Sequence, residues 1–417
     1  MLENEPNGNA TAFTAERLKE TRKAFFISHM VQEPFLALYS MLGILITKQL
    51  DASPFQVAVL TMLKPMVSVL SFYWGSFLQQ KRTHLRANLL IATSFAVLPF
   101  AFAPLVDHAW FFVAAGAIYS LFSRAAIPAR MELLKINVPT EERERLFSNA
   151  SCLAYAVGVV ASVSFGVLLD LRPDWWTQLV CAASLVSLFS VAALASIPDG
   201  GAEACRRPID ASVKEILLHP WAAALRLLDS RPDFLHFQIG FFLAGLGLMV
   251  AMPAIPAFLT NLNVSYTELF FSLGVLKGLG FLLTSNLWAK AIRRFPISLV
   301  SKMVFFFFSL FLVCLLLSGF TPMFVLVAYG IYGIAQAGSH LVWNLSGPIF
   351  AGSETSFQYS SVNILAIGIR GMIGPLIGGL IAQFLSPQIA IATGCLIGLS
   401  AAWYMASLRT EKGTWQS

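Results

Sequence analysis

Long apolar runs alternate with short polar segments along the whole chain. Each run extends over about 20 residues, enough for a helix to cross a hydrocarbon core of about 30 Å. Twelve such runs follow one another, starting near residues 24, 55, 87, 109, 146, 176, 234, 267, 300, 323, 359 and 387. The two-residue alternation of a membrane β-strand does not occur. The pattern therefore predicts an all-α polytopic membrane protein with twelve transmembrane helices.

The polar segments between these runs divide the chain into five parts. The first apolar run is longer than the core of a signal peptide, which has about 7 to 15 residues, so we interpret it as a retained span. We expect a tail over 1–23, a six-helix bundle over 24–197, a hydrophilic linker over 198–233, a second six-helix bundle over 234–408 and a tail over 409–417.

Basic residues collect in alternate loops. If the N-terminus is cytoplasmic, twenty-two of the 28 Lys and Arg residues, Arg130 among them, fall in inner segments, and the outer loops hold only Lys48 and Arg172. The positive-inside rule then places both termini and the linker in the cytoplasm. We expect a protein of the plasma membrane, which is the inner membrane in a bacterium, surrounded by membrane lipid.

Composition narrows the classes of function. The chain is 57% hydrophobic and 12% charged, whereas soluble domains carry about 25% charged residues. Its net charge of +6 is spread over short loops, which does not indicate a nucleic-acid partner. The five cysteines form no metal-binding spacing, and Walker, His-Glu-x-x-His and Gly-x-Ser-x-Gly motifs do not occur. We expect neither an enzyme nor a metal or cofactor, and a monomer suffices.

The second half of the chain repeats the first. A shift of 213 residues superposes pairs from three different spans, which a chance match of small residues does not explain. The shift aligns Leu63 and Lys64 with Leu276 and Lys277, Ile118 and Tyr119 with Ile331 and Tyr332, Ser148 with Ser361, Gly158 with Gly371, and Gly166 with Gly379. We therefore predict two pseudo-symmetric six-helix bundles.

Two parallel six-helix repeats joined by a cytoplasmic linker resemble the major facilitator superfamily over nearly the whole chain. The loop after the second span matches part of that family's motif, as Gly75-Ser-Phe-Leu-Gln79-Gln80-Lys81-Arg82, with Gln79 where the family has aspartate. The resemblance implies transport by alternating access, with substrate bound near the midplane between the halves. It also implies a gating role for Gly75, Lys81 and Arg82.

A second glycine-rich segment lies in the eleventh span, as Gly371-Met-Ile-Gly374-Pro375-Leu-Ile-Gly378-Gly379. A similar Gly-Pro pattern occurs in the fifth span of proton-coupled exporters, but here the aligned position in that span is Ser162. Glycine lets helix backbones approach closely, and proline bends a helix. Gly374 and Pro375 are therefore candidate gating residues, with tight helix packing as the alternative.

Three basic residues fall near the middle of spans, where a charge costs about 2.5 to 3.5 kcal/mol unless it meets a partner or water. They are Lys64, its repeat equivalent Lys277, and Arg370. Asn363 lies one heptad before Arg370 on the same helical face. We expect these four residues, with Gln32, to bind substrate. Because the resulting cavity is positive, it favours an organic anion or a zwitterion with an exposed carboxylate or phosphate.

The first span carries a candidate site for proton coupling. His29 and Glu33 lie four residues apart on one helical face, and a buried carboxylate or histidine can take up a proton when its surroundings change. Two alternatives stay open. Glu33 and Lys64 can form an ion pair that only fixes packing, and transport can be uncoupled from protons.

The sequence therefore favours a secondary active transporter that moves a small polar, anionic or zwitterionic, organic solute by alternating access, with possible proton symport. Its partners are a small-molecule substrate and, in the coupled case, protons. The alternative is a lipid flippase or a drug or metabolite exporter on the same scaffold. Arg124, near the inner end of the fourth span, is read as an inner-gate residue or as a cation that snorkels to the interface.

Overall fold

The computed structural model describes residues 8–80, 84–199, 213–352 and 356–408, and the regular structure in these ranges is helical. A helix covers each of the twelve predicted spans. By length and composition, ten of the described helices can cross a membrane, or eleven if the bent pair Ala15–Ser40 and Leu42–Leu50 forms one broken span. The predicted class, an all-α polytopic membrane protein, is confirmed.

The chain forms two compact units. Unit 1 comprises Met1–Leu42 and Leu70–Pro208, and unit 2 comprises Gly43–Val69 and Ile209–Ser417. Residues 43–69, which the sequence assigns to the first bundle, therefore group with the second half of the chain. The bundle boundaries expected from the sequence stay a prediction.

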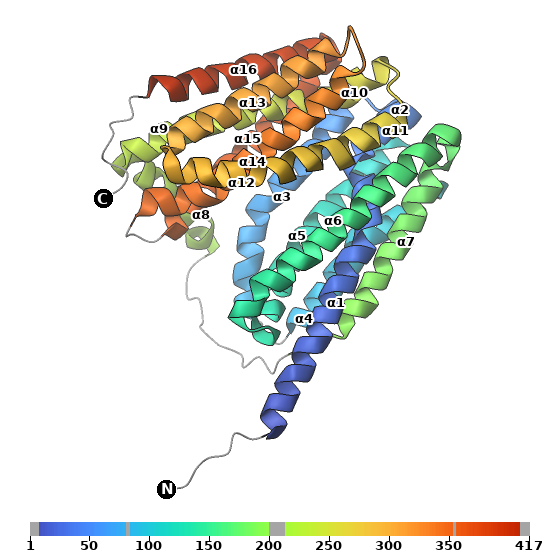
Figure 1. Cartoon of the computed structure of the whole chain (residues 1–417), viewed down its shortest axis with the longest axis vertical. Helices are drawn as coiled ribbons and strands as arrows, with labels where there is room; N and C mark the ends of the chain where they lie inside the picture. The colour runs from blue at the N-terminus through green and yellow to red at the C-terminus, as the bar shows by residue number, and fades with distance from the viewer. Residues whose placement is uncertain (1–7, 81–83, 200–212, 353–355, 409–417) are drawn as a thin grey trace. The chain divides into compact units, whose positions relative to one another are not determined.

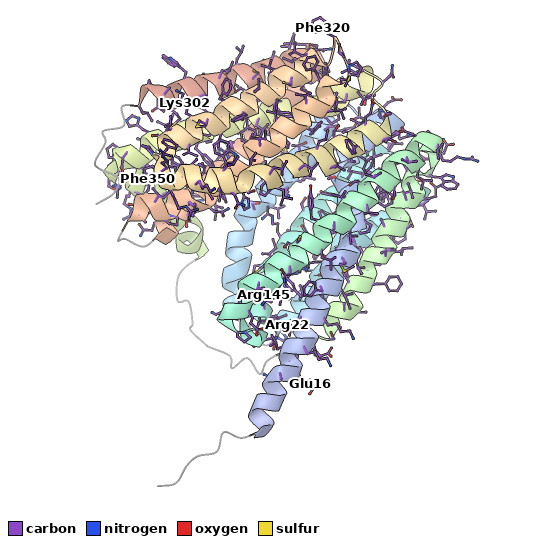
Figure 2. All side chains as sticks on the ribbon, viewed as in Figure 1. Glu16, Arg22, Arg145, Lys302, Phe320 and Phe350 are labelled. Atoms are coloured by element: carbon purple, nitrogen blue, oxygen red, sulfur yellow. The ribbon has the colours of Figure 1, made fainter. Side chains whose placement is uncertain are left out.

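Unit 1 is built from long helices that run alongside one another (Figure 1). α1 packs against α6 and α7, and α4 packs against α5 and α7. At one end of the unit lie the charged residues Glu16, Arg22 and Arg145 (Figure 2), and Arg22 donates to the carboxylate of Glu142. The elements are α1 (Gly8–Ser40), the later part of α3 (Pro54–Gln80), α4 (Leu85–Val97), η2 (Leu98–Leu105), α5 (Ala109–Asn137), α6 (Thr140–Leu171), η3 (Pro173–Trp175) and α7 (Trp176–Ala195).

Unit 2 holds the second set of long helices and the short segment from the first half of the chain. α9 packs against α15 and α16, and α14 packs against α12 and α13. The elements are α2 (Leu42–Leu50), the first part of α3, α8 (Val213–Ser230), α9 (Pro232–Ala251), α10 (Ala254–Asn261), α11 (Tyr266–Phe270), η4 (Phe271–Leu276), α12 (Lys277–Arg294), α13 (Ile297–Leu317), α14 (Phe324–Ala351), α15 (Ser356–Phe384) and α16 (Pro387–Ser407).

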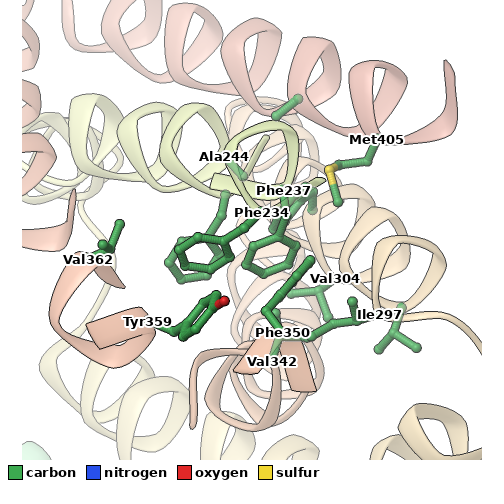
Figure 3. Close-up of a cluster of buried hydrophobic side chains, with 14 of the residues drawn as sticks. Phe234, Phe237, Ala244, Ile297, Val304, Val342, Phe350, Tyr359, Val362 and Met405 are labelled. Atoms are coloured by element: carbon green, nitrogen blue, oxygen red, sulfur yellow. The ribbon is translucent and has the colours of Figure 1, made fainter. Parts of the chain in front are cut away.

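An aromatic cluster forms the core of unit 2 (Figure 3). Phe234, Phe350 and Tyr359 come from three different helices, and the rings of Phe350 and Tyr359 lie 5.1 and 5.0 Å from that of Phe234. Arg231, just before α9, donates to the Tyr359 hydroxyl at 2.8 Å and to the Phe350 carbonyl at 3.2 Å. It also forms an ion pair with Asp233 at 2.9 Å. These contacts tie the start of α9 to α14 and α15.

The segment predicted as a hydrophilic linker contains a helix, α8. Outside the cores, large apolar side chains cover the helices, and Leu283, Phe189 and Trp403 are each at least 70% exposed. An apolar surface of this extent fits hydrocarbon rather than water. The backbone polar groups are bonded inside the helices, as a lipid environment requires.

Matching turns in unit 2 show the internal repeat in atomic detail. Asp51 and Asn263 adopt left-handed backbone conformations with φ of 49° and 53°. Ser53 and Gln56 cap the start of α3 reciprocally, and Ser265 and Glu268 form a capping box at the start of α11. Asn263, Ser265 and Glu268 each lie 212 residues after their counterparts Asp51, Ser53 and Gln56. This offset is one residue shorter than that between Lys64 and Lys277.

A π-helical turn accounts for the additional residue. Between Glu268 and Lys277 the chain forms η4, and the N–H of Lys277 bonds to the carbonyl of Ser272, five residues earlier. A π-turn absorbs one extra residue within a helix. Lys277 therefore keeps the helical face that Lys64 has on α3, although its segment is one residue longer.

Candidate substrate-binding site

Lys64 and Lys277 form the most exposed part of the candidate site in unit 2. The two ammonium groups lie close enough to interact electrostatically, and the Lys277 ammonium lies 6.0 Å from the centroid of the Tyr332 ring. We call these two residues the lysine pair. Among the ion pairs of the described residues, none involves Lys277.

Close contact between α12 and α14 fixes the backbone of Lys277. A Cβ atom added at Gly333 of α14 would overlap the Lys277 carbonyl, and one added at Gly280 would overlap the carbonyl of Gly330. Small residues at both positions let the two backbones touch, as is typical of packed membrane helices. The start of α12 is therefore held against α14, which limits where the Lys277 side chain can reach.

Arg370 lies deeper in unit 2, between α15 and α9. Its side chain is 7% exposed, its guanidinium carbon lies 4.4 Å from the centre of the Phe241 ring, and Nη1 donates to the Phe241 carbonyl. The absent side chain of Gly245 leaves the space that the guanidinium fills. Within the described residues Nε is buried without a hydrogen-bond partner, and no carboxylate forms an ion pair with Arg370.

Asn363 shares the α9-facing side of α15 with Arg370, as the heptad spacing predicts. Its amide is held by protein groups: it accepts from Gln238, and it donates to the Ser346 hydroxyl at 2.8 Å and to the Trp343 carbonyl at 3.5 Å. Asn363 is also 2% exposed. A role in substrate binding stays a prediction for this residue, and its present contacts are those of a packing residue.

The candidate coupling residues occupy unit 1. The Glu33 carboxylate lies beside Gly158 of α6, where a Cβ would come within 2.9 Å of Oε2. No ion pair of the described residues includes Glu33. His29 donates from Nδ1 to the Phe25 carbonyl at 2.8 Å, because a carbonyl can only accept. Gln32 donates to the Ser190 hydroxyl at 2.9 Å, so its amide already has a protein partner.

The sequence did not single out Tyr119 and Arg130, which interact electrostatically with the candidate coupling residues Glu33 and His29. Tyr119 of α5 lies close enough to Glu33, Arg124 and Arg130 for electrostatic interaction, and its ring centre is 4.2 Å from that of Tyr39. Arg130 is part-buried within α5, and among the described residues its Nε has no partner. Sequence reasoning assigned Arg130 to an inner polar segment. The repeat held a usable signal, because Tyr119 is equivalent to Tyr332, the neighbour of Lys277.

The glycine-rich segment of α15 packs on two sides. Gly374 faces α9, where an added Cβ would lie 2.7 Å from the Cβ of Met249, and Gly378 faces the carbonyl of Val250. Gly371 and Gly379 face α3, at Pro65 and Ala58. Pro375 lies between them inside the helix. Close helix packing is thus observed, and gating by Gly374 and Pro375 stays a prediction.

The other predicted gating residues are Gly75, Lys81 and Arg82. Gly75 lies in the part of α3 of which only the backbone is described, and Lys81 and Arg82 fall outside the described residues. Their gating role stays a prediction.

A polytopic helical bundle with an internal repeat and cationic side chains within its apolar helices is typical of membrane transporters. The sequence profile of the Major Facilitator Superfamily matches residues 25–364. The chain therefore belongs to the Major Facilitator Superfamily, a family of non-enzymatic transporters that move small molecules across membranes. No curated protein matches the sequence.

Solved structures share the fold at low sequence identity. A crystal structure of a variant of the nucleoside transporter NupG has 14% identity and a TM-score of 0.71, covering 94% of this chain and all of that one. A POT family transporter in complex with 5-aminolevulinic acid has 11% identity and a TM-score of 0.67, covering 93% and 95%. The xylose transporter XylE from E. coli, in an inward open conformation, has 12% identity and a TM-score of 0.63, covering 96% and 98%.

Proposed function

We propose that this secondary transporter moves a small organic anion, or a zwitterion with an exposed carboxylate or phosphate. The lysine pair carries this proposal. Lys277 interacts electrostatically with Lys64, and the described part of the chain gives Lys277 no ion-pair partner. An anion from solution supplies the missing counter-charge, and a low local dielectric strengthens the attraction.

Arg370 supports the same substrate class in a second way. Its guanidinium is held by an aromatic ring and one carbonyl rather than by a carboxylate, so unit 2 keeps a further positive charge. The scaffold can hold a ligand of this class, since the similar POT family transporter is in complex with an amino-carboxylic acid, 5-aminolevulinic acid.

Thermal stabilisation tests the substrate class. Purified protein is screened against amino acids, nucleotides and organic anions, and the hits are repeated with Lys64→Ala, Lys277→Ala and Arg370→Ala. We expect anions to raise the unfolding temperature of the wild type and the lysine variants to lose this response. Hits that persist in all three variants would show that these cations do not bind the ligand. Hits confined to lipids or to cationic drugs would favour a flippase or an exporter instead.

Proton symport through Glu33 is the second part of the proposal. Glu33 has no ion-pair partner among the described residues and interacts electrostatically with Tyr119, so its carboxylate can gain a proton without breaking a salt bridge. His29 is the second candidate. Uptake into proteoliposomes with and without an imposed pH gradient tests coupling, and equal uptake in both conditions excludes it.

We also propose that both termini face the cytoplasm of the plasma membrane, because the predicted inner segments hold nearly all loop Lys and Arg residues. Labelling of single cysteines in intact cells tests this orientation. The outer loop near Arg172 should react with an impermeant reagent and the tails should not.

A further inference from the structure

The guanidinium of Arg370 has more hydrogen-bond donors than its protein neighbours use. An arginine carries five N–H donors in a rigid planar fork. Nη1 of Arg370 donates to the Phe241 carbonyl, and within the described ranges this is its one hydrogen bond. Nε is buried, and neither Nε nor Nη2 has a hydrogen-bond partner among the described residues. The edge of the guanidinium that holds Nε and Nη2 is therefore left unpaired.

The charge of Arg370 also lacks a counter-charge. The residue lies inside α15 and is 7% exposed, and no ion pair of the described residues includes it. A cation buried within an apolar helix keeps its charge at a cost unless a partner is bound. The Phe241 ring and carbonyl offset part of that cost. A negatively charged group that arrives from outside the protein would complete the pairing.

Contacts with α9 limit the direction in which the unpaired edge can point. The guanidinium carbon lies 4.4 Å from the centre of the Phe241 ring, and that ring stacks on Trp343 of α14 with 5.9 Å between the ring centres. The absent side chain of Gly245 leaves the space that the guanidinium fills. Because one face lies against a ring and Nη1 is engaged, the guanidinium cannot turn freely. The fork is therefore oriented before a ligand binds.

We propose that the Nε–Nη2 edge of Arg370 binds a carboxylate of the substrate through two parallel hydrogen bonds. This inference rests on the proposed function and narrows it from an anion to a carboxylate. Two adjacent N–H donors match the two oxygens of a carboxylate, which can lie in the plane of the guanidinium. Phe241 and Gly245, which border the guanidinium, have no side-chain donor for the further oxygens of a phosphate.

Carboxylates and their amides test the proposal, because the two groups are similar in shape and differ in charge. The purified full-length protein is titrated with lactate, succinate and benzoate, with lactamide, succinamide and benzamide, and with inorganic phosphate. Affinity is read from the shift in unfolding temperature. We expect at least one carboxylate to bind about tenfold or more tighter than its amide, and tighter than phosphate.

Variants that keep the charge assign this preference to the fork. Arg370→Lys keeps the positive charge but loses the planar fork, and it should weaken carboxylate binding about tenfold or more while the affinity for the amides stays unchanged. Arg293→Lys, at an exposed position at the end of α12, is the matched control and should behave as the wild type.

A second variant covers the case in which Arg370→Lys does not fold. Phe241→Leu keeps the fork but removes the ring that lies against it, so it should weaken the same carboxylates by a smaller factor. The unfolding temperature without ligand shows whether each variant is folded.

Three results overturn the inference, and they separate it from the proposed function. Carboxylate binding at wild-type affinity in the folded variants of Arg370 and Phe241 places the carboxylate elsewhere but leaves an anion transporter. Tighter binding of phosphate than of any carboxylate, lost in Arg370→Lys, assigns the fork to a phosphate ester instead. No response of the wild type to any of these anions refutes the proposed substrate class as well.

Discussion

Gly245 sets the position of the Arg370 guanidinium, and this makes Gly245→Ala an informative change. A methyl group at position 245 would overlap Cζ, Nη1 and Nε of Arg370. These atoms are the end of a flexible side chain, so the guanidinium moves while the helices stay in place. It then leaves the Phe241 ring, 4.4 Å away, and the Phe241 carbonyl.

The free-energy cost of the added methyl group sets how much stability Gly245→Ala should lose. Forcing an extra methyl into a packed site costs about 1 to 3 kcal/mol, and alanine returns about 0.5 to 1 kcal/mol of helix propensity relative to glycine. The net loss of folding free energy should therefore be about 0 to 2.5 kcal/mol. The displaced guanidinium gives up its cation–π contact and its charged hydrogen bond, and this loss is part of that cost rather than an addition to it.

Two assays on the same preparation test this reasoning. The free energy of unfolding should fall by no more than about 2.5 kcal/mol, while proteoliposome uptake of the anion found by screening should fall about as far as it does in Arg370→Ala. The double variant should show no further loss, because both changes act through one group. Gly330→Ala is the control, since an added Cβ there meets nothing within 4 Å. Wild-type uptake by Gly245→Ala would refute a functional role for this guanidinium position.

Three further changes test other parts of the structure. Deletion of Leu273 should convert η4 into an ordinary α-turn and preserve uptake. Deletion of its repeat equivalent Leu60, in a helix without an extra residue, should instead turn Lys64 by about 100° and abolish uptake. Loss of uptake in both deletion variants would contradict the role of η4. Tyr266→Phe removes the 2.6 Å hydrogen bond from Gln49 and should lower the free energy of unfolding by about 1 kcal/mol. The measurement is the unfolding midpoint, and an unchanged midpoint would show that the bond contributes nothing. Glu33→Gln should remove the response of uptake to an imposed pH gradient, and a response equal to that of the wild type would exclude Glu33 as the proton carrier.

The fold was predictable because apolar length is a direct consequence of membrane thickness. The interruptions of the spans were not predictable from the sequence. The break between α1 and α2 at Met41 and the π-turn of η4 both depend on how neighbouring helices pack. The change of repeat offset from 212 to 213 residues is visible in the sequence once the capping residues Ser53 and Ser265 are aligned. Matching only the lysines and glycines conceals it.

The candidate site was predictable only in outline. Lys64, Lys277 and Arg370 stand out because charges are rare inside spans. Their separate environments could not be predicted, since Arg370 depends on Phe241 and Gly245 of another helix.

Two residues show what the sequence alone did not predict about the site. Asn363 is predicted to bind substrate, and the structure adds that its amide is hydrogen-bonded to Gln238 and Ser346, which the sequence could not predict. Arg130 was assigned to a polar segment by its distance along the chain, whereas α5 extends past it and partly buries it. Burial and hydrogen bonding at both positions come from contacts between helices, and a single sequence does not specify which helices meet.

Exchange of a labelled anion across proteoliposomes is the decisive measurement for a lysine-based substrate site. Proteoliposomes loaded with the unlabelled anion chosen by the binding screen are prepared with the wild type, Lys277→Arg or Lys277→Gln, and their exchange rates are compared. We predict rapid exchange for the first two proteins and a loss of about tenfold or more for Lys277→Gln. Exchange by Lys277→Gln at the wild-type rate and affinity would contradict substrate recognition by the lysine pair.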